Sequence, residues 1–161
     1  MKKTIILLAI IMSFSWLNES KAQYTTGIGL RAGVTNGLTV KHFINQNAAL
    51  EGILHSRWGG LMITGLYEVH NDIRDVKGLM WFYGGGAHLG TWNGRGRYRN
   101  QPPWAEPNRG YTVFGIDGII GLDYKFTDFP VNLSLDYKPA INFGHYGYGW
   151  DEVALSIRFT F

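Results

Sequence analysis

Residues Trp150–Phe161 read W-D-E-V-A-L-S-I-R-F-T-F, and this stretch decides the fold. From Val153 to Phe161 every odd position is apolar, whereas the even positions hold Ala154, Ser156, Arg158 and Thr160. Strict alternation with a period of two is typical of a β-strand that has one apolar and one polar face. The strand ends on the last residue, although chain termini are usually solvated and frayed. An apolar strand in this position is rare in soluble proteins.

The N-terminal segment has the pattern of an export signal. Lys2 and Lys3 precede an apolar run from Ile5 to Ile11, and Ser20-Lys21-Ala22 places small residues at the −3 and −1 positions of a cleavage site. This pattern predicts a secretory signal peptide over residues 1–22 and a mature domain over residues 23–161. The apolar run is shorter than the ~20 residues that a membrane-spanning helix needs. The sequence contains no cysteine, which excludes disulfides and a lipid-modified cysteine.

Charge and length narrow the class of the mature domain. Removing residues 1–22 takes away three of the 15 basic residues and one of the 12 acidic residues, which leaves a net charge of +1. Nucleic-acid binding is therefore not expected, because its electrostatic footprint is missing. No later apolar run is long enough for a spanning helix, so insertion into a membrane would require a β-barrel. Residues 23–161 suit a single domain.

Seven further segments show the same alternation, and they bring the number of expected strands to eight: Thr26–Val34, Leu38–Ile44, Ala48–Trp58, Leu61–His70, Leu79–Thr91, Tyr111–Phe126 and Val131–Phe143. Asn36-Gly37 is a strong tight-turn signal between the first two, and Pro139 predicts a bulge in the seventh. Eight is the smallest strand number among single-chain outer-membrane barrels. With both termini in the periplasm, the long connection Trp92–Gly110 falls on the external side, where long loops belong. The sequence predicts an all-β fold, an eight-stranded antiparallel transmembrane β-barrel with up-and-down meander topology.

The charged residues on the polar faces indicate which face points inward. Six are basic and six are acidic: Arg31, Lys41, Glu51, Arg57, Glu68, Asp117, Asp123, Lys125, Asp136, Lys138, Glu152 and Arg158. Balanced charges suit a narrow lumen in which ions must pair, because an unpaired buried charge is very costly. The interior of eight strands is just wide enough for side chains to fill it. We therefore expect a lumen charge network that plugs the barrel. A soluble periplasmic lipid-binding barrel would instead carry these charges on its surface.

The chain resembles the small outer-membrane β-barrel proteins of Gram-negative bacteria, the OmpA-like and OmpX-like eight-stranded type, in the style found in the Bacteroidetes. Four motifs carry the resemblance: Tyr83-Gly-Gly-Gly-Ala-His-Leu-Gly90, Gly115-Ile-Asp-Gly-Ile-Ile-Gly-Leu-Asp-Tyr-Lys-Phe126, Leu133-Ser-Leu-Asp-Tyr-Lys-Pro139 and Arg158-Phe-Thr-Phe161. The likeness covers the whole mature domain. It implies architecture and the bacterial outer membrane as location, and it says little about activity.

Some eight-stranded barrels modify lipid A, so an outer-membrane enzyme is the alternative function. Hydrolysis there would need a serine activated by a histidine that an acid orients. His88 is expected near the external end of the lumen, Ser134 near the opposite end and Ser156 at mid-strand, so no catalytic residue is predicted. His55, His70 and His88 show no spacing that would join two metal ligands. Neither a metal nor a cofactor is expected.

The connection Trp92–Gly110 is the remaining candidate for a binding site. It contains Arg95, Arg97, Arg99 and Arg109. These arginines form either a solvated loop or a contact with lipopolysaccharide phosphates, which guanidinium groups bind well. We therefore predict a monomer with a non-enzymatic structural or surface-interaction role. Its expected partners are outer-membrane lipid, lipopolysaccharide and, through the last strand ending at Phe161, the barrel-assembly machinery.

Overall fold

A computed structural model describes residues 24–57, 60–92, 110–143 and 149–161, with only the backbone of Arg57, Trp92, Gly149 and Trp150. These residues form eight β-strands and no helix: β1 (Thr26–Gly33), β2 (Asn36–Phe43), β3 (Ala48–Arg57), β4 (Gly60–Asp72), β5 (Leu79–Trp92), β6 (Tyr111–Lys125), β7 (Val131–Asn142) and β8 (Gly149–Thr160). The predicted signal peptide, residues 1–22, lies outside the described residues.

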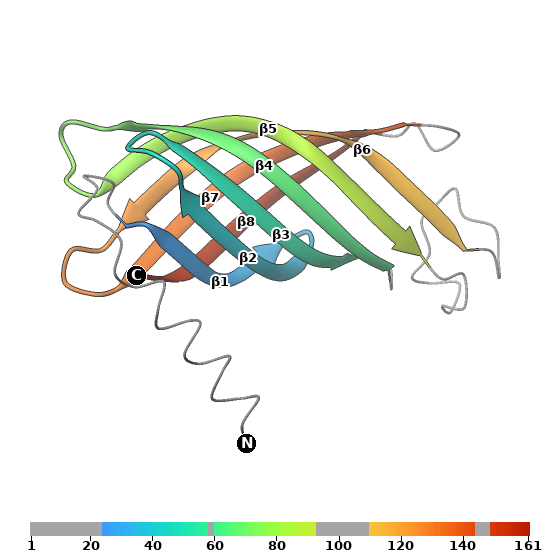
Figure 1. The fold of residues 1–161 in the computed structure, drawn as a ribbon, viewed down its shortest axis with the longest axis horizontal. Helices are drawn as coiled ribbons and strands as arrows, with labels where there is room; N and C mark the ends of the chain where they lie inside the picture. The colour runs from blue at the N-terminus through green and yellow to red at the C-terminus, as the bar shows by residue number, and fades with distance from the viewer. Residues whose placement is uncertain (1–23, 58–59, 93–109, 144–148) are drawn as a thin grey trace, which may run out of the picture.

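The strands close into a single barrel in sequence order, as Figure 1 shows. Every neighbouring pair is antiparallel, and β1 completes the ring by pairing with β8, for example through Leu30 opposite Ile157. The predicted fold class is thereby confirmed. The beginning of β1 and the end of β8 lie at the same end of the barrel as the β4–β5 and β6–β7 turns (Figure 1), and we call this the termini end. There the backbone N–H of Thr160 donates to the carbonyl of Pro130 at 2.9 Å.

Two local predictions were wrong. Asn36 and Gly37 belong to β2, and the turn from β1 lies at Val34–Thr35. Tertiary contacts outweigh the dipeptide signal there, because the Thr35 hydroxyl points into the barrel and donates to Glu152. Pro139 produces no bulge. The β6–β7 pairing passes from Asp117 opposite Ala140 to Ile120 opposite Tyr137, so it skips two residues on each strand without inserting an extra one. The missing N–H of proline accounts for this gap in the ladder.

Alternation along each strand separates an apolar outer wall from a polar interior. On β4, Leu61 and Ile63 are more than half exposed on the outside, whereas Met62 and Thr64 are buried inside. The same pattern recurs on β8, where Ile157 is 51% exposed and its neighbour Arg158 is 1% exposed. This distribution of apolar and polar side chains is the reverse of the one found in a soluble barrel. A soluble lipid-binding barrel would need the apolar faces to point inward.

Candidate functional site

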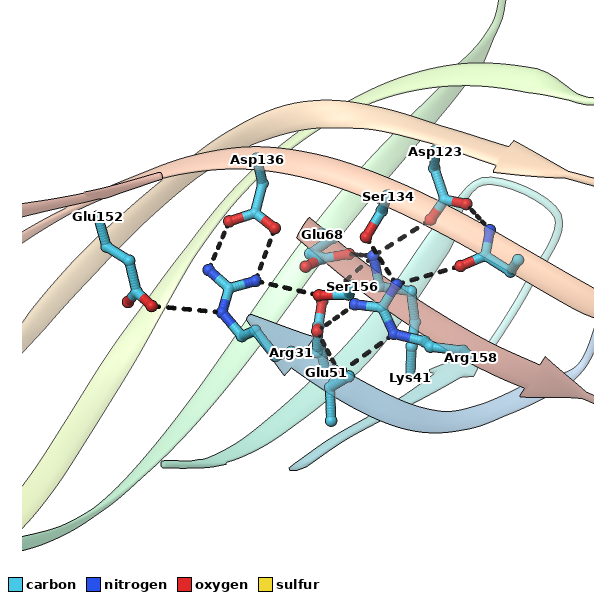
Figure 2. A network of polar contacts seen from close by, with 12 residues as sticks. Arg31, Lys41, Glu51, Glu68, Asp123, Ser134, Asp136, Glu152, Ser156 and Arg158 are labelled. Carbon is cyan, nitrogen blue, oxygen red and sulfur yellow. Dashed lines mark hydrogen bonds and ion pairs between the residues drawn. The ribbon is translucent and has the colours of Figure 1, made fainter. Parts of the chain in front are cut away.

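The interior of the barrel holds ten of the twelve charged residues expected there, and each of the ten forms an ion pair with a residue of opposite charge among the described residues. They are Arg31, Lys41, Glu51, Glu68, Asp117, Asp123, Asp136, Lys138, Glu152 and Arg158. None is more than 5% exposed. All strands except β5 contribute at least one of them, and β5 contributes His88, which pairs with Asp117. Figure 2 shows that the contacts fall into two groups along the barrel axis.

Lys41 forms the centre of the group nearer the termini end (Figure 2). Its Nζ lies 2.7 Å from Glu68, 3.2 Å from Glu51 and 3.3 Å from Asp123. The ammonium also lies 4.1 Å from the centroid of the Phe82 ring. Lys41 is directly opposite Glu51 in the β2–β3 ladder, and cross-strand neighbours on one face lie within reach of each other. A single buried cation therefore compensates parts of three carboxylates from three strands.

Arg158 completes this group by contacting four side chains. Its Nη2 lies 2.5 Å from Glu51, and its Nη1 donates to Ser134 at 2.8 Å and to Asn132 at 3.1 Å. The Nε donates to Thr39 at 3.1 Å. The planar guanidinium presents five N–H donors in a fixed geometry, and these contacts use its three nitrogens. Arg158 thus ties β8 to strands on both sides of the lumen.

The second group is built around Arg31. Nη1 and Nη2 each lie 2.6 Å from one oxygen of Asp136, which is a bidentate pair, and Nε lies 3.6 Å from Glu152. Glu152 also contacts Lys138 at 3.3 Å, its direct neighbour in the β7–β8 ladder. Bidentate charge-assisted pairs are among the strongest in proteins and fix the planes of both groups.

From Lys138 the network continues to His88 on β5. Lys138 Nζ lies 3.0 Å from one oxygen of Asp117, and Nδ1 of His88 lies 2.7 Å from the other. The second ring nitrogen of His88 lies 2.8 Å from Oδ1 of Asn142. Gly115 makes room for this ring, because a Cβ there would come within 2.6 Å of its Cε1 atom. The network therefore passes from β1 through β8, β7 and β6 to β5.

An aromatic stack lies beside the Lys41 group. Tyr24 contacts Phe43 edge-on at 5.0 Å between ring centroids, Phe43 lies 4.7 Å from the ring of His70, and His70 stacks on Phe82 at 4.9 Å. Nε2 of His70 also lies 3.0 Å from Glu68. Because Tyr24 precedes β1, the stack lies in the part of the lumen toward the termini end.

Several uncharged or weakly basic residues of the lumen contact members of the two groups. The Thr35 hydroxyl contacts Nδ1 of His55 at 2.8 Å as well as Glu152. Ser134 and Ser156, the serines weighed as nucleophiles, each accept a hydrogen bond from a guanidinium, of Arg158 and Arg31 respectively. A serine in this role is a hydrogen-bond acceptor for a cation.

The other predicted site residues lie elsewhere. Lys125 is at the rim of the termini end, where its Nζ donates to the carbonyls of Phe126 and Phe129 at 2.7 and 2.8 Å. Its expected place in the lumen charge network is wrong, because it is the last residue of β6 and its side chain reaches the following turn. The side chain of Arg57 is outside the described part of the chain. The same holds for Arg95, Arg97, Arg99 and Arg109, so the predicted lipopolysaccharide contact is outside it too.

Sequence reasoning missed the uncharged partners of the network. Thr39, Asn132 and the aromatic residues Phe43 and Phe82 all point inward. Their positions in the alternation would have placed them on the inner face. Nothing in the sequence indicated that Tyr24, which stands before the first strand, closes the stack.

No group of histidine, cysteine, aspartate or glutamate side chains within the described residues has the geometry of a metal site. Over the same residues, no helix is long and apolar enough to cross a membrane.

No protein-family model and no curated protein matches the sequence. Among solved structures, the chain is similar to the N-terminal β-barrel domain of Pseudomonas aeruginosa OprF. The TM-score is 0.61 at 14% identity, over 84% of this chain and 95% of that domain. The protein is thus a closed eight-stranded barrel with the fold of the OprF domain, which confirms the resemblance to small OmpA-like barrels.

Proposed function

We propose that the protein is an integral β-barrel of the bacterial outer membrane with a non-enzymatic structural or surface-interaction role. The observation that carries the proposal is the reversal of the usual distribution of side chains. Leu30, Ile63 and Phe159 are about 60% exposed on the outer wall, whereas Arg31, Lys41 and Glu68 are no more than 1% exposed inside. In water such a wall would be a large apolar patch, whereas in a bilayer it contacts hydrocarbon.

We further propose that the two ion-pair groups and the aromatic stack plug the lumen. The inward side chains come from all eight strands and contact one another across the barrel, as in the pairs Arg31–Asp136 and Arg158–Glu51. Such a filled lumen favours a structural role over the role of a water-filled pore. The proposed partners are outer-membrane lipid, lipopolysaccharide at Arg95, Arg97, Arg99 and Arg109, and the barrel-assembly machinery at the strand that ends near Phe161.

Gel mobility tests the membrane placement. The detergent-extracted outer-membrane fraction is compared boiled and unboiled, because closed membrane barrels resist unfolding by SDS until they are heated. A heat-dependent shift in this fraction is the expected result. Recovery of the protein in the soluble periplasmic fraction, without a shift, would contradict the proposal.

Mass spectrometry of lipid A tests the non-enzymatic role. We expect the acyl pattern of lipid A to be the same in cells with and without the gene. A change in acyl number or length that returns with the wild-type gene would favour a lipid A-modifying enzyme instead.

A further inference from the structure

A cleft opens at the termini end, between the β4–β5 turn and the neighbouring β6–β7 turn. Its volume is about 660 Å³. Ile73, Val76, Leu79 and Phe126 supply apolar wall. Gly78, with a φ of 90°, shapes one side, and its carbonyl accepts a hydrogen bond from the backbone N–H of Lys125 at 2.8 Å. This bond joins the two turns, so the cleft lies between elements that are fixed to each other.

Within the described part of the chain, the lysine and arginine side chains outside the lumen gather at this cleft. Among the lysine and arginine side chains that the structure describes, the three outside the lumen are Arg74, Lys77 and Lys125, and all three line the cleft. Asp72 is the acidic residue in its lining. Asp75 and Asp128 lie on the same two turns but do not line it. The lining therefore combines apolar wall with an excess of cations.

Lys125 is held in place within the cleft. Its Nζ donates to the carbonyls of Phe126 and Phe129, and an ammonium has three donors. The two carbonyls use two of them, so the third N–H is available to an anion. An ammonium that is already oriented loses less side-chain entropy on binding than a mobile surface lysine does.

The surrounding side chains place the cleft at the level of lipid headgroups. On the outer wall of β5, close to the turn, Trp81 and Tyr83 stack at 5.4 Å between ring centroids. Phe129, Phe159 and Phe161 are exposed at the same end of the barrel. Aromatic girdles mark the interface between hydrocarbon and water in membrane barrels. The cleft lies beyond Trp81 and Tyr83 on the side away from the mid-wall, since Gly78 and Leu79 at the start of β5 line it. Phosphates of one leaflet would lie at this level.

We propose that this cleft binds an anionic phospholipid of the leaflet that surrounds the termini end. The headgroup phosphate contacts Arg74, Lys77 and the remaining donor of Lys125, and the glycerol and upper acyl region contacts the apolar wall. Guanidinium and ammonium groups both bind phosphate through charge-assisted hydrogen bonds. The inference rests on the proposed placement of the barrel in a membrane.

Native mass spectrometry of the protein purified from outer membranes tests the site. Protein in detergent that shows the heat-dependent mobility shift receives either phosphatidylglycerol or phosphatidylcholine with the same acyl chains, and the retained lipid is counted. We expect retention of one phosphatidylglycerol in clear preference to phosphatidylcholine. The double variant Arg74→Gln/Lys77→Gln should weaken this retention roughly thirtyfold, since each cation near an anionic membrane surface contributes about 1 kcal/mol. The matched control Arg74→Lys/Lys77→Arg keeps both charges and should retain the lipid.

Three outcomes would overturn the inference. Equal retention of the two lipids, or unchanged retention by the Gln double variant, would show that the cleft does not select an anionic lipid. Displacement of the lipid by millimolar inorganic phosphate would show that the site takes phosphate alone. Failure of the membrane proposal would give a different result. The protein would be recovered in the soluble fraction without the mobility shift, before any lipid is added.

Discussion

Replacement of Lys41 by methionine is the most direct test of the lumen network. Methionine has a similar length and no charge, so the change removes one cation from three carboxylates without leaving a large cavity. Glu51 would keep Arg158 at 2.5 Å. Asp123 would keep the hydroxyl of Tyr24 at 3.4 Å. Glu68 would keep its contact with His70. It would have no lysine or arginine left within ion-pairing distance among the described side chains.

The expected loss of stability in Lys41→Met follows from the carboxylate of Glu68, which is left without a cation. Removing one partner of a buried ion pair lowers the free energy of unfolding by about 3–5 kcal/mol, because the other charge stays buried. The double variant Lys41→Met/Glu68→Gln also removes the charge left behind. We therefore expect it to recover about 2–3 kcal/mol of the loss, within the range of coupling energies for residues in contact.

Urea unfolding of the protein folded into phospholipid vesicles, followed by tryptophan fluorescence, measures these values. The four species needed are wild type, Lys41→Met, Glu68→Gln and the double variant. A loss below about 1 kcal/mol for Lys41→Met would refute the reasoning, since exposed ion pairs contribute that little. The reasoning would also be refuted if the losses in the free energy of unfolding of the two single variants added up to that of the double variant. The contribution of Glu68 to stability would then be independent of Lys41.

Three further predictions concern the second ion-pair group, a close approach and the outer wall. Arg31→Lys cannot form the bidentate pair with Asp136, and we expect a loss of about 1–3 kcal/mol in the same urea assay. Gly115→Ala would place a Cβ 2.2 Å from the carbonyl of Ile141 and 2.6 Å from the ring of His88. The overpacking should cost about 1–3 kcal/mol, and an unchanged midpoint in urea would contradict this geometry. Ile63→Lys on the outer wall should cost about 2–4 kcal/mol in vesicles if this position faces the bilayer interior. A soluble barrel would tolerate that change, so full stability in vesicles would count against the membrane placement.

The strands and their faces could be predicted from the sequence because alternation is a local property. Each side chain on a strand points to the side opposite its neighbours, so the order of residues alone separates Ile157 from Arg158 or Ile63 from Thr64. The observed strand boundaries differ from the expected ones by a few residues: β4 spans Gly60–Asp72, whereas Leu61–His70 was expected. Pairing with the next strand decides where a strand ends, and the sequence of one strand does not contain that information.

The contacts within the network could not be predicted, with the exception of nearest cross-strand neighbours. Lys41–Glu51 and Lys138–Glu152 follow from hairpin register. Arg31–Asp136 and Arg158–Glu51 join residues more than 100 positions apart in the chain. Such pairs exist because the barrel closes through β1 and β8, which brings distant strands to face each other across a narrow lumen.

The sequence by itself determined that this chain forms eight strands with an apolar and a charged face, since strand geometry has a fixed period of two. Beyond the nearest cross-strand neighbours, the tertiary structure alone decided which cation meets which carboxylate, and that the side chain of Lys125 reaches a turn and not the lumen. It also brought Arg74, Lys77 and Lys125 to one cleft, although Lys125 is distant from the other two in the chain. The physical reason is that ion pairing and clefts depend on distances across the closed barrel, which arise only when every strand has found its neighbour.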